Sequence, residues 1–365
     1  MIIGVLKERA PETRVSLVPE VVQSLVKMNV QVWVEPGAGS NAFYADQAYT
    51  EAGAVLKDAA AIGQEADIIL SIHGENIATD VKEGSVLIGV YQPLFHPERM
   101  REWAARRHTV FSLDTIPRTT RAQAMDVLSS QANIAGYKAV LLAASQYCRY
   151  FPMFMTAAGS IPPAKVLVLG AGVAGLQAIA TARRLGAVVS VFDTRPAVKE
   201  EVMSLGAKFV EVEGAADASK AGGYAVEQSA AFLQRQKEKI HEQITKADIV
   251  ITTAQIPGKK APVLVTTEMI ESMRPGSVIV DLAAATGGNT ELTRNNETIH
   301  HAGVAIIGNS ALSATMPADA SRLYSKNVFN FLKLIIDKEG NLHLNYQDDI
   351  VKGTSVLYKQ ETAKI

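Results

Sequence analysis

The sequence predicts an α/β protein built from two Rossmann-like domains, each with a doubly wound parallel sheet, linked by long helices. Two observations carry this prediction. Short apolar runs alternate along the chain with longer segments of helical periodicity, which is typical of βα units around a parallel sheet. A glycine-rich turn, Gly170–Gly175, follows one of these runs and opens a helical pattern. The length of 365 residues suits two domains of ordinary size.

The first domain is predicted over residues 1–135 and 315–365, so it is discontinuous in the sequence. A helical pattern that follows Pro317 is expected to return and complete it. Helices are also expected at Pro19–Met28, where Pro is allowed at a helix start, and at Glu98–Arg107. The expected strands are Ile2–Leu6, Val30–Val34, Asp67–Ile72, Ser85–Val90 and Thr109–Leu113.

The second domain is predicted over residues 136–314. A long helix rich in Ala, Leu, Ser and Gln is expected to begin at Ala122 and to lead into this domain, running on to Arg149. A small, polar segment between Val212 and Gln228 has no apolar period and indicates a long loop, a kind that is often functional. The expected strands are Val166–Leu169, Val188–Phe192, Lys208–Val210, Asp248–Thr253, Ser277–Asp281 and Val304–Ile307.

Composition excludes several classes of function. The chain carries 36 Lys and Arg against 37 Asp and Glu, so it has no basic field that would bind nucleic acid by bulk charge. A single cysteine, Cys148, allows no intrachain disulfide and argues against a metal site of the structural zinc type; we interpret it as a packed helix residue. The N-terminus is charged too early for a signal peptide, and no apolar run reaches the ~18 residues of a membrane span. We therefore expect a soluble, cytoplasmic chain.

The turn after the strand at Val166–Leu169 predicts a dinucleotide site. Gly170 permits the tight turn, Gly172 lets the backbone approach a pyrophosphate, and Gly175 lets helix and strand pack closely. The start of the following helix offers free N–H groups and a positive dipole to the phosphates. The alternative is an ordinary βα turn.

The next strand ends at Asp193, which strengthens the prediction. Its carboxylate can accept hydrogen bonds from the adenosine ribose hydroxyls and would repel a 2′-phosphate, so NAD(H) is preferred over NADP(H). Thr194 and Arg195 follow directly and are assigned to the same end of the cofactor. Arg195 leaves the preference open, because a nearby Arg can serve a 2′-phosphate.

Four segments carry a resemblance to a known family: Pro117–Tyr137, Met155–Gly159, Gly170–Ala180 and Ile256–Lys259. Together they closely resemble the NAD(H)-binding domain I of the proton-translocating NAD(P) transhydrogenases, in the form where the alpha subunit is split and this domain is a separate chain. A piece of a longer chain is equally compatible. The resemblance spans nearly the whole chain, and it extends more distantly to the alanine dehydrogenases, which share the two-domain fold.

The resemblance implies a role for each residue that matches. Arg118 and Asp126 would engage the nicotinamide carboxamide, Ser129 would assist, and Gln123 would reach toward the nicotinamide ribose and the partner's nucleotide. Tyr224 would close over the bound nucleotide, with backbone freedom supplied by Gly222 and Gly223. Residues that would line the nucleotide site are Val173, Gln236 and Gln255. Without the resemblance, Arg118 and Asp126 are interpreted as an exposed salt bridge, Tyr224 as a surface residue and Gln236 as a solvated side chain.

The resemblance also separates two chemistries. An amino-acid dehydrogenase needs a positioned acid or base and cations for its substrate carboxylate. Where alanine dehydrogenases carry Lys, His and Asp, this sequence has His73, Gln92 and Ala285, and only Arg14 retains the substrate-site arginine. Hydride transfer between two nicotinamides needs no proton transfer to either ring, only rings held face to face without water. The substitutions therefore favour transhydrogenation over oxidation of an amino acid.

A second dinucleotide fingerprint is missing, so NADP(H) is expected on a partner. The resemblance implies an NADP(H)-binding beta subunit, a membrane-spanning subunit that couples hydride transfer to proton passage, and a homodimer of this chain. The chain would then lie on the inner face of the cytoplasmic membrane through its partners. Two other functions stay open: an NAD-dependent amino-acid dehydrogenase of the alanine type, and a non-catalytic NAD-sensing module.

Overall fold

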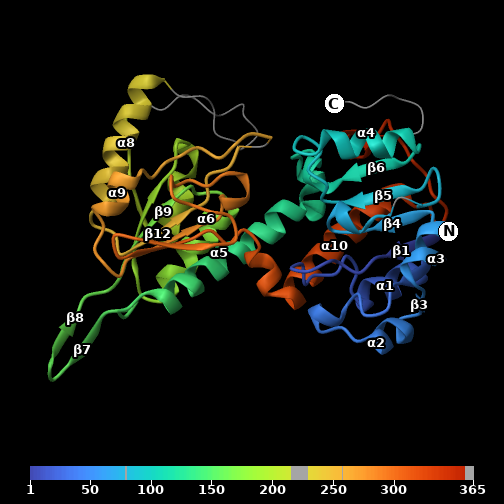
Figure 1. Ribbon diagram of the computed structural model, residues 1–365, viewed down its shortest axis with the longest axis horizontal. Helices are drawn as coiled ribbons and strands as arrows, with labels where there is room; N and C mark the ends of the chain where they lie inside the picture. The colour runs from blue at the N-terminus through green and yellow to red at the C-terminus, as the bar shows by residue number, and fades with distance from the viewer. Residues whose placement is uncertain (79, 215–228, 257, 358–365) are drawn as a thin grey trace. The chain divides into compact units, whose positions relative to one another are not determined.

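The computed structural model describes residues 1–78, 80–214, 229–256 and 258–357 (Figure 1). The chain forms two compact units, of which unit 1 comprises Met1–Gln131 with Ser313–Ile365 and unit 2 comprises Ala132–Leu312. The expected closing loop, with Gly222, Gly223 and Tyr224, lies outside the described residues.

Unit 1 is built on a seven-stranded sheet with the order β16-β6-β5-β4-β1-β2-β3. All neighbouring strands are parallel except β16, which runs antiparallel to β6. Without β16 the order is that of a Rossmann sheet, 3-2-1-4-5-6. The strands are β1 (Ile2–Val5), β2 (Gln31–Val34), β3 (Val55–Leu56), β4 (Ile68–Leu70), β5 (Val86–Gly89), β6 (Thr109–Ser112) and β16 (Ser355–Leu357).

Helices cover both faces of this sheet. Alternate residues of a strand point to opposite faces, so they pack into two separate cores. Ile68 and Leu70 of β4 pack in the core that includes Phe331, whereas Ile69 packs in the core that includes Trp103. Phe331 lies on the long returning helix after Pro317 and Trp103 on α4. The helices are α1 (Pro19–Val26), α2 (Asp46–Glu51), α3 (Ala59–Glu65), α4 (Pro97–Ala105), α10 (Pro317–Ile335) and α11 (Asp349–Thr354).

Unit 2 repeats this arrangement, with the strand order β11-β10-β9-β12-β13-β15-β14. Only β14 is antiparallel to its neighbour, and the other six strands again follow the order 3-2-1-4-5-6. The strands are β9 (Lys165–Leu169), β10 (Val188–Phe192), β11 (Lys208–Phe209), β12 (Ile249–Thr252), β13 (Val278–Asp281), β14 (Thr298–His301) and β15 (Val304–Ile307).

The sheet of unit 2 is also covered on both faces. Val166 and Val168 of β9 pack with residues of α5 and α6, whereas Leu167 and Leu169 pack with residues of α8. A hairpin of β7 (Phe154–Thr156) and β8 (Gly159–Ile161) precedes the sheet (Figure 1). The helices are α5 (Val127–Gln146), α6 (Val173–Arg184), α7 (Lys199–Ser204), α8 (Ala230–Ile244) and α9 (Thr267–Glu271).

The predicted fold class is confirmed, and two local predictions are wrong. The long helix does not begin at Ala122, since Thr120–Met125 forms a 3₁₀ turn and α5 starts at Val127. The carboxylate of Asp126 accepts the N–H of Ser129 at 2.9 Å, as an N-cap does, and this fixes the helix start. Cys148 is not a packed helix residue, because α5 ends at Gln146 and the cysteine is exposed beyond it.

Candidate nucleotide-binding site

The turn between β9 and α6 is fixed by close backbone packing. Gly170 has φ +106°, and its N–H donates to the carbonyl of Phe192 at 2.8 Å. A Cβ at Gly175 would lie 1.9 Å from the carbonyl oxygen of Gly170, so only glycine lets the helix approach the strand end this closely. Both glycines therefore do what the sequence predicted of them, within the turn itself.

Gly172 differs from these two glycines because a Cβ there would meet no atom within 4 Å. Its backbone is extended, with φ −76° and ψ −170°, and α6 begins at the next residue, Val173, which is 40% exposed. The first N–H groups of a helix have no partner within the helix. The structure thus offers an open approach to the helix start, which fits a pyrophosphate.

Asp193, at the end of β10, is bound by its neighbours on both carboxylate oxygens. Oδ2 accepts the N–H of Ala171 at 2.7 Å and an N–H of Arg195 Nη2 at 2.7 Å. Oδ1 accepts the backbone N–H of Arg195 and its Nε–H, both at 2.8 Å. The hydrogen bonds from the Arg195 side chain to Asp193 raise the pKa of its guanidinium above its ordinary value. Thr194 lies between the two residues, so the predicted ribose end is assembled from one short segment.

The loop after β12 is held by a residue that the sequence did not single out. Asn289, fully buried, accepts the N–H of Ala254 at 3.0 Å and donates to the carbonyls of Ala254 and Pro262, both at 2.8 Å. Asp281 in turn accepts the N–H of Asn289 at 2.6 Å. This anchoring places Gln255, whose Nε2 donates to the carbonyl of Leu282 at 3.0 Å. An Asn that follows two glycines after a strand is the signal that could have found it.

Gln236 lies on α8 and is buried rather than solvated. Its Oε1 atom has no hydrogen-bond donor among the described residues. A buried amide oxygen without a donor costs free energy, on the order of 1–3 kcal/mol. This position suits a polar ligand group, and the interpretation of Gln236 as a solvated side chain is wrong.

Unit 1 holds Arg118, Gln123, Asp126 and Ser129, on the segment before α5 and in the first turn of that helix. Besides the N–H of Ser129, Asp126 accepts the Ser129 hydroxyl at 2.6 Å, so these two predicted residues are directly bonded. Gln123 and Arg118 are exposed on the same segment. The four residues are already close in the sequence, on one short stretch of chain, and the structure adds the hydrogen bonds between Asp126 and Ser129.

This stretch is anchored by the C-terminal part of unit 1. Arg121 forms an ion pair with Asp348 through two hydrogen bonds, at 2.6 and 2.8 Å, and a further ion pair with Asp349. Two side chains of α10, Asn327 and Asn330, donate to the carbonyl of Ala124 at 2.9 and 3.0 Å. The 3₁₀ turn that carries Gln123 is thus fixed on both sides of that residue.

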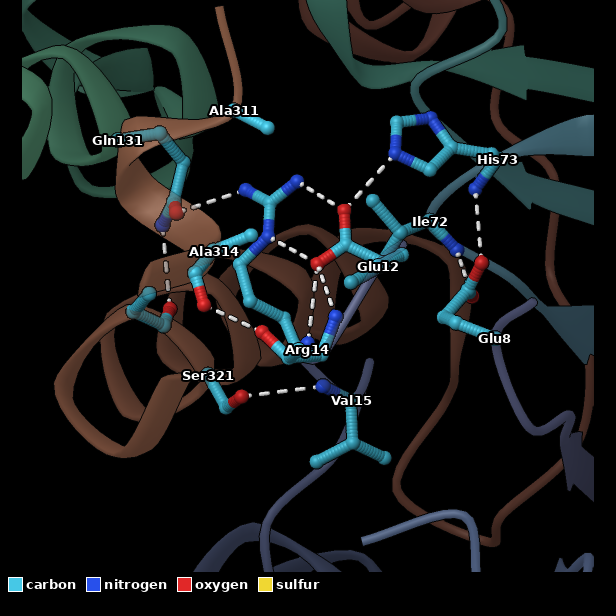
Figure 2. Close-up of polar contacts among 12 residues, drawn as sticks. Glu8, Glu12, Arg14, Val15, Ile72, His73, Gln131, Ala311, Ala314 and Ser321 are labelled. Carbon is cyan, nitrogen blue, oxygen red and sulfur yellow. Dashed lines mark hydrogen bonds and ion pairs between the residues drawn. The ribbon is translucent and has the colours of Figure 1, made fainter. Parts of the chain in front are cut away.

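A separate ionic cluster surrounds Arg14 in unit 1 (Figure 2). Arg14 donates from Nε and Nη2 to the two carboxylate oxygens of Glu12, at 2.8 and 2.6 Å, and from Nη1 to Gln131 at 2.8 Å. His73, after β4, lies 2.9 Å from Glu12. Burial would raise the pKa of Glu12, but the hydrogen bonds from Arg14 and His73 outweigh it and lower the pKa. The charge of Arg14 is therefore neutralised by the chain's own Glu12 carboxylate.

The described residues contain neither a cluster of metal-binding side chains nor a helix that could span a membrane. No group of three or more His, Cys, Asp or Glu side chains is placed to hold a metal ion among the described residues. No helix in those residues is both long enough and apolar enough to span a bilayer.

Comparisons with known proteins place the whole chain. Residues 4–135 match the family model Alanine dehydrogenase/PNT, N-terminal domain, and residues 139–364 match Alanine dehydrogenase/PNT, C-terminal domain. An NAD(P) transhydrogenase alpha-subunit chain of Rhodospirillum rubrum is 46% identical over 368 residues, which cover 98% of this chain and 96% of that protein. The chain belongs to the transhydrogenase alpha-subunit family.

A second relative and one solved structure agree with this membership, and another solved structure shares the fold. The NAD(P) transhydrogenase subunit alpha of Haemophilus influenzae is 45% identical, over 98% of this chain and 70% of that protein. A transhydrogenase from Sinorhizobium meliloti superposes with a TM-score of 0.89 at 45% identity, covering 98% of this chain and 99% of that one. An L-alanine dehydrogenase superposes with a TM-score of 0.81 at 24% identity, covering 99% of this chain and 96% of that one, and so shares the fold. The resemblance seen in the sequence is confirmed, including its more distant branch.

Proposed function

We propose that this chain is the NAD(H)-binding subunit of a proton-translocating transhydrogenase and that it passes hydride between NADH and NADP⁺ held on a partner subunit. One observation carries the proposal: the chain is similar along nearly its full length to a transhydrogenase alpha subunit. The geometry of its β9–α6 turn, which suits a dinucleotide, supports the proposal.

The residues of unit 2 would bind the nucleotide without chemistry of their own. The open approach at Gly172 and the start of α6 suit the pyrophosphate, and Asp193 suits the adenosine ribose. Val173, Gln236 and Gln255 would line the same site. When bound, NAD(H) supplies the hydride.

The anchored stretch of unit 1 would orient the nicotinamide end. Arg118, Asp126 and Ser129 would hold the carboxamide through charge and hydrogen bonds, and Gln123 would face the partner's nucleotide. Orientation is what this reaction demands, because hydride transfer from one nicotinamide to another needs no proton transfer to either ring. The 3₁₀ turn is held by the ion pair of Arg121 and by the side-chain amides that donate to the Ala124 carbonyl, and this anchoring supports such a role.

The remaining components of the enzyme would lie on other chains. We propose that NADP(H) binds a beta subunit and that a membrane-spanning subunit couples the transfer to proton passage. This chain, as a homodimer, would then sit at the inner face of the cytoplasmic membrane through those partners.

The amino-acid dehydrogenase alternative is weakened by Arg14. An oxo-acid carboxylate would have to compete with Glu12 for this guanidinium at a site with little net positive charge. The NAD-sensing alternative gives no reason to anchor the Gln123 turn on both sides. Neither alternative gains an observation of its own.

The test measures binding and transfer separately. The purified chain is titrated with NADH and with NADPH by nicotinamide fluorescence, and hydride transfer is then assayed with a separately expressed NADP(H)-binding subunit. We expect NADH to bind preferentially, transfer only when the partner is present, and Gln123→Ala to lower the transfer rate much more than NADH affinity. Steady turnover of pyruvate and ammonia by the chain alone would reject the proposal.

A further inference from the structure

Every hydrogen-bond acceptor position of the Asp193 carboxylate is occupied by a donor of the protein. A carboxylate has about four acceptor positions, two on each oxygen. Both positions on Oδ1 and both on Oδ2 are used by N–H groups of Ala171 and Arg195. The side chain of Asp193 is 5% exposed, against 19% for Arg195, so little of the carboxylate is open to solvent.

The four hydrogen bonds divide into a fixed and a removable pair. The backbone N–H groups of Ala171 and Arg195 are held by the turn and donate one bond to each oxygen. The other two bonds come from Nε and Nη2 of the Arg195 side chain, again one to each oxygen. Rotating this side chain away would therefore release one acceptor position on Oδ1 and one on Oδ2.

Two neighbouring acceptor positions, one on each oxygen, match the two hydroxyls of a ribose. The parallel N–H groups of a guanidinium fork and the O–H groups of a vicinal diol are both paired donors directed at one carboxylate. Arg195 thus occupies the places that the adenosine ribose needs.

We propose that the Arg195 side chain is an internal competitor of the ribose, which NAD(H) must displace from Asp193 in order to bind. This inference rests on the proposed function, because it takes NAD(H) as the ligand of unit 2. The competition lowers affinity for NAD(H) and eases its release between turnovers. It also sets the preference between nucleotides, because Arg195 offsets the negative charge with which Asp193 repels a 2′-phosphate.

The test compares variants of the full chain by fluorescence titration with NADH and with NADPH. Arg195→Ala is expected to bind NADH roughly three- to tenfold more tightly, which corresponds to the loss of one partly exposed ion pair. The same variant is expected to bind NADPH more weakly than the unaltered chain, since Asp193 then lacks its neutralising cation. Arg195→Lys keeps the charge but cannot donate in parallel to two oxygens. Its affinities for NADH and NADPH are expected to lie between those of the unaltered chain and those of Arg195→Ala.

A matched control and three outcomes decide the matter. Arg184→Ala removes the same charge from an exposed position on α6 and should leave both affinities unchanged. Weaker NADH binding in Arg195→Ala would mean that Arg195 holds the nucleotide directly. Unchanged NADH binding would mean that the ion pair has no effect on the nucleotide. Either result would overturn this inference but leave the proposed function standing. An unaltered chain that binds no NADH would overturn the proposed function together with it.

Discussion

Arg14 and Glu12 form a forked ion pair inside unit 1, with Nε–Oε1 and Nη2–Oε2 distances of 2.8 and 2.6 Å (Figure 2). Both side chains are nearly buried, and Gln131 takes a further hydrogen bond from the same guanidinium. The pair therefore has a structural role that does not depend on any ligand. It joins the segment after β1 to the beginning of α5.

Removing the arginine should destabilise the fold while sparing nucleotide binding. Arg14→Met leaves the buried Glu12 carboxylate without its guanidinium, next to His73 and the backbone N–H groups of residues 13 and 14, and we expect a loss of about 3 kcal/mol in the free energy of unfolding. Adding Glu12→Gln should recover part of that loss, because no buried charge is then left unpaired. Chemical denaturation measures both effects. A normal stability combined with lost NADH binding in Arg14→Met would instead place Arg14 in the nucleotide site.

Glu8, in the same cluster, should make stability fall as pH rises. Its Oε1 accepts the N–H of Ile72 at 2.6 Å, yet burial dominates and raises its pKa from 4.5 to about 7. A folded-state pKa above the unfolded value gives stability that is complete below about pH 4.5 and is lost as pH rises through about 7. This shift corresponds to a loss of about 3 kcal/mol across that window.

The pH effect can be isolated by substitution. Glu8→Gln removes the titration, so its melting temperature should change less between pH 5 and pH 8 than that of the unaltered chain. Glu65→Gln, which alters an exposed carboxylate of the same unit, should keep the original pH dependence. Identical pH profiles for Glu8→Gln and the unaltered chain would contradict the assignment.

The sequence predicts features that depend on contacts between nearby residues, and it does not predict features that depend on contacts between distant ones. The strand, turn and helix around Gly170 and Gly175 are local, and the structure has them as expected. The anchors of the Gln123 turn come from Asp348 and Asn327, more than two hundred residues away, and no local pattern signals them. Asp193 and Arg195 are close in the chain, yet their residue types alone did not show whether Arg195 pairs with Asp193 or is free to bind a 2′-phosphate.

The ion pair of Arg121 should affect the hydride-transfer rate more than nucleotide binding. Arg121→Met removes the two hydrogen bonds to Asp348 but keeps the N-cap that Asp348 provides to α11. We expect NADH affinity to stay within about twofold and transfer with the partner subunit to slow by roughly three- to tenfold, since the turn loses one of its fixings. Arg101→Met, on the exposed face of α4, should change neither value. Equal losses of affinity and rate would point to a general disturbance of unit 1.

The two glycines Gly172 and Gly175 should fail in opposite ways when replaced by alanine. Gly172→Ala meets no atom within 4 Å and has an ordinary extended backbone, so stability should be kept or rise by about 0.4–1 kcal/mol. NADH affinity should nevertheless fall at least about tenfold, because the new methyl group fills the approach to the start of α6. Gly175→Ala places Cβ 1.9 Å from the Gly170 carbonyl oxygen and should destabilise the fold itself by about 1–3 kcal/mol. Thermal denaturation and NADH titration of both variants check this contrast. Full NADH affinity in a stable Gly172→Ala variant would show that the pyrophosphate does not lie at this turn.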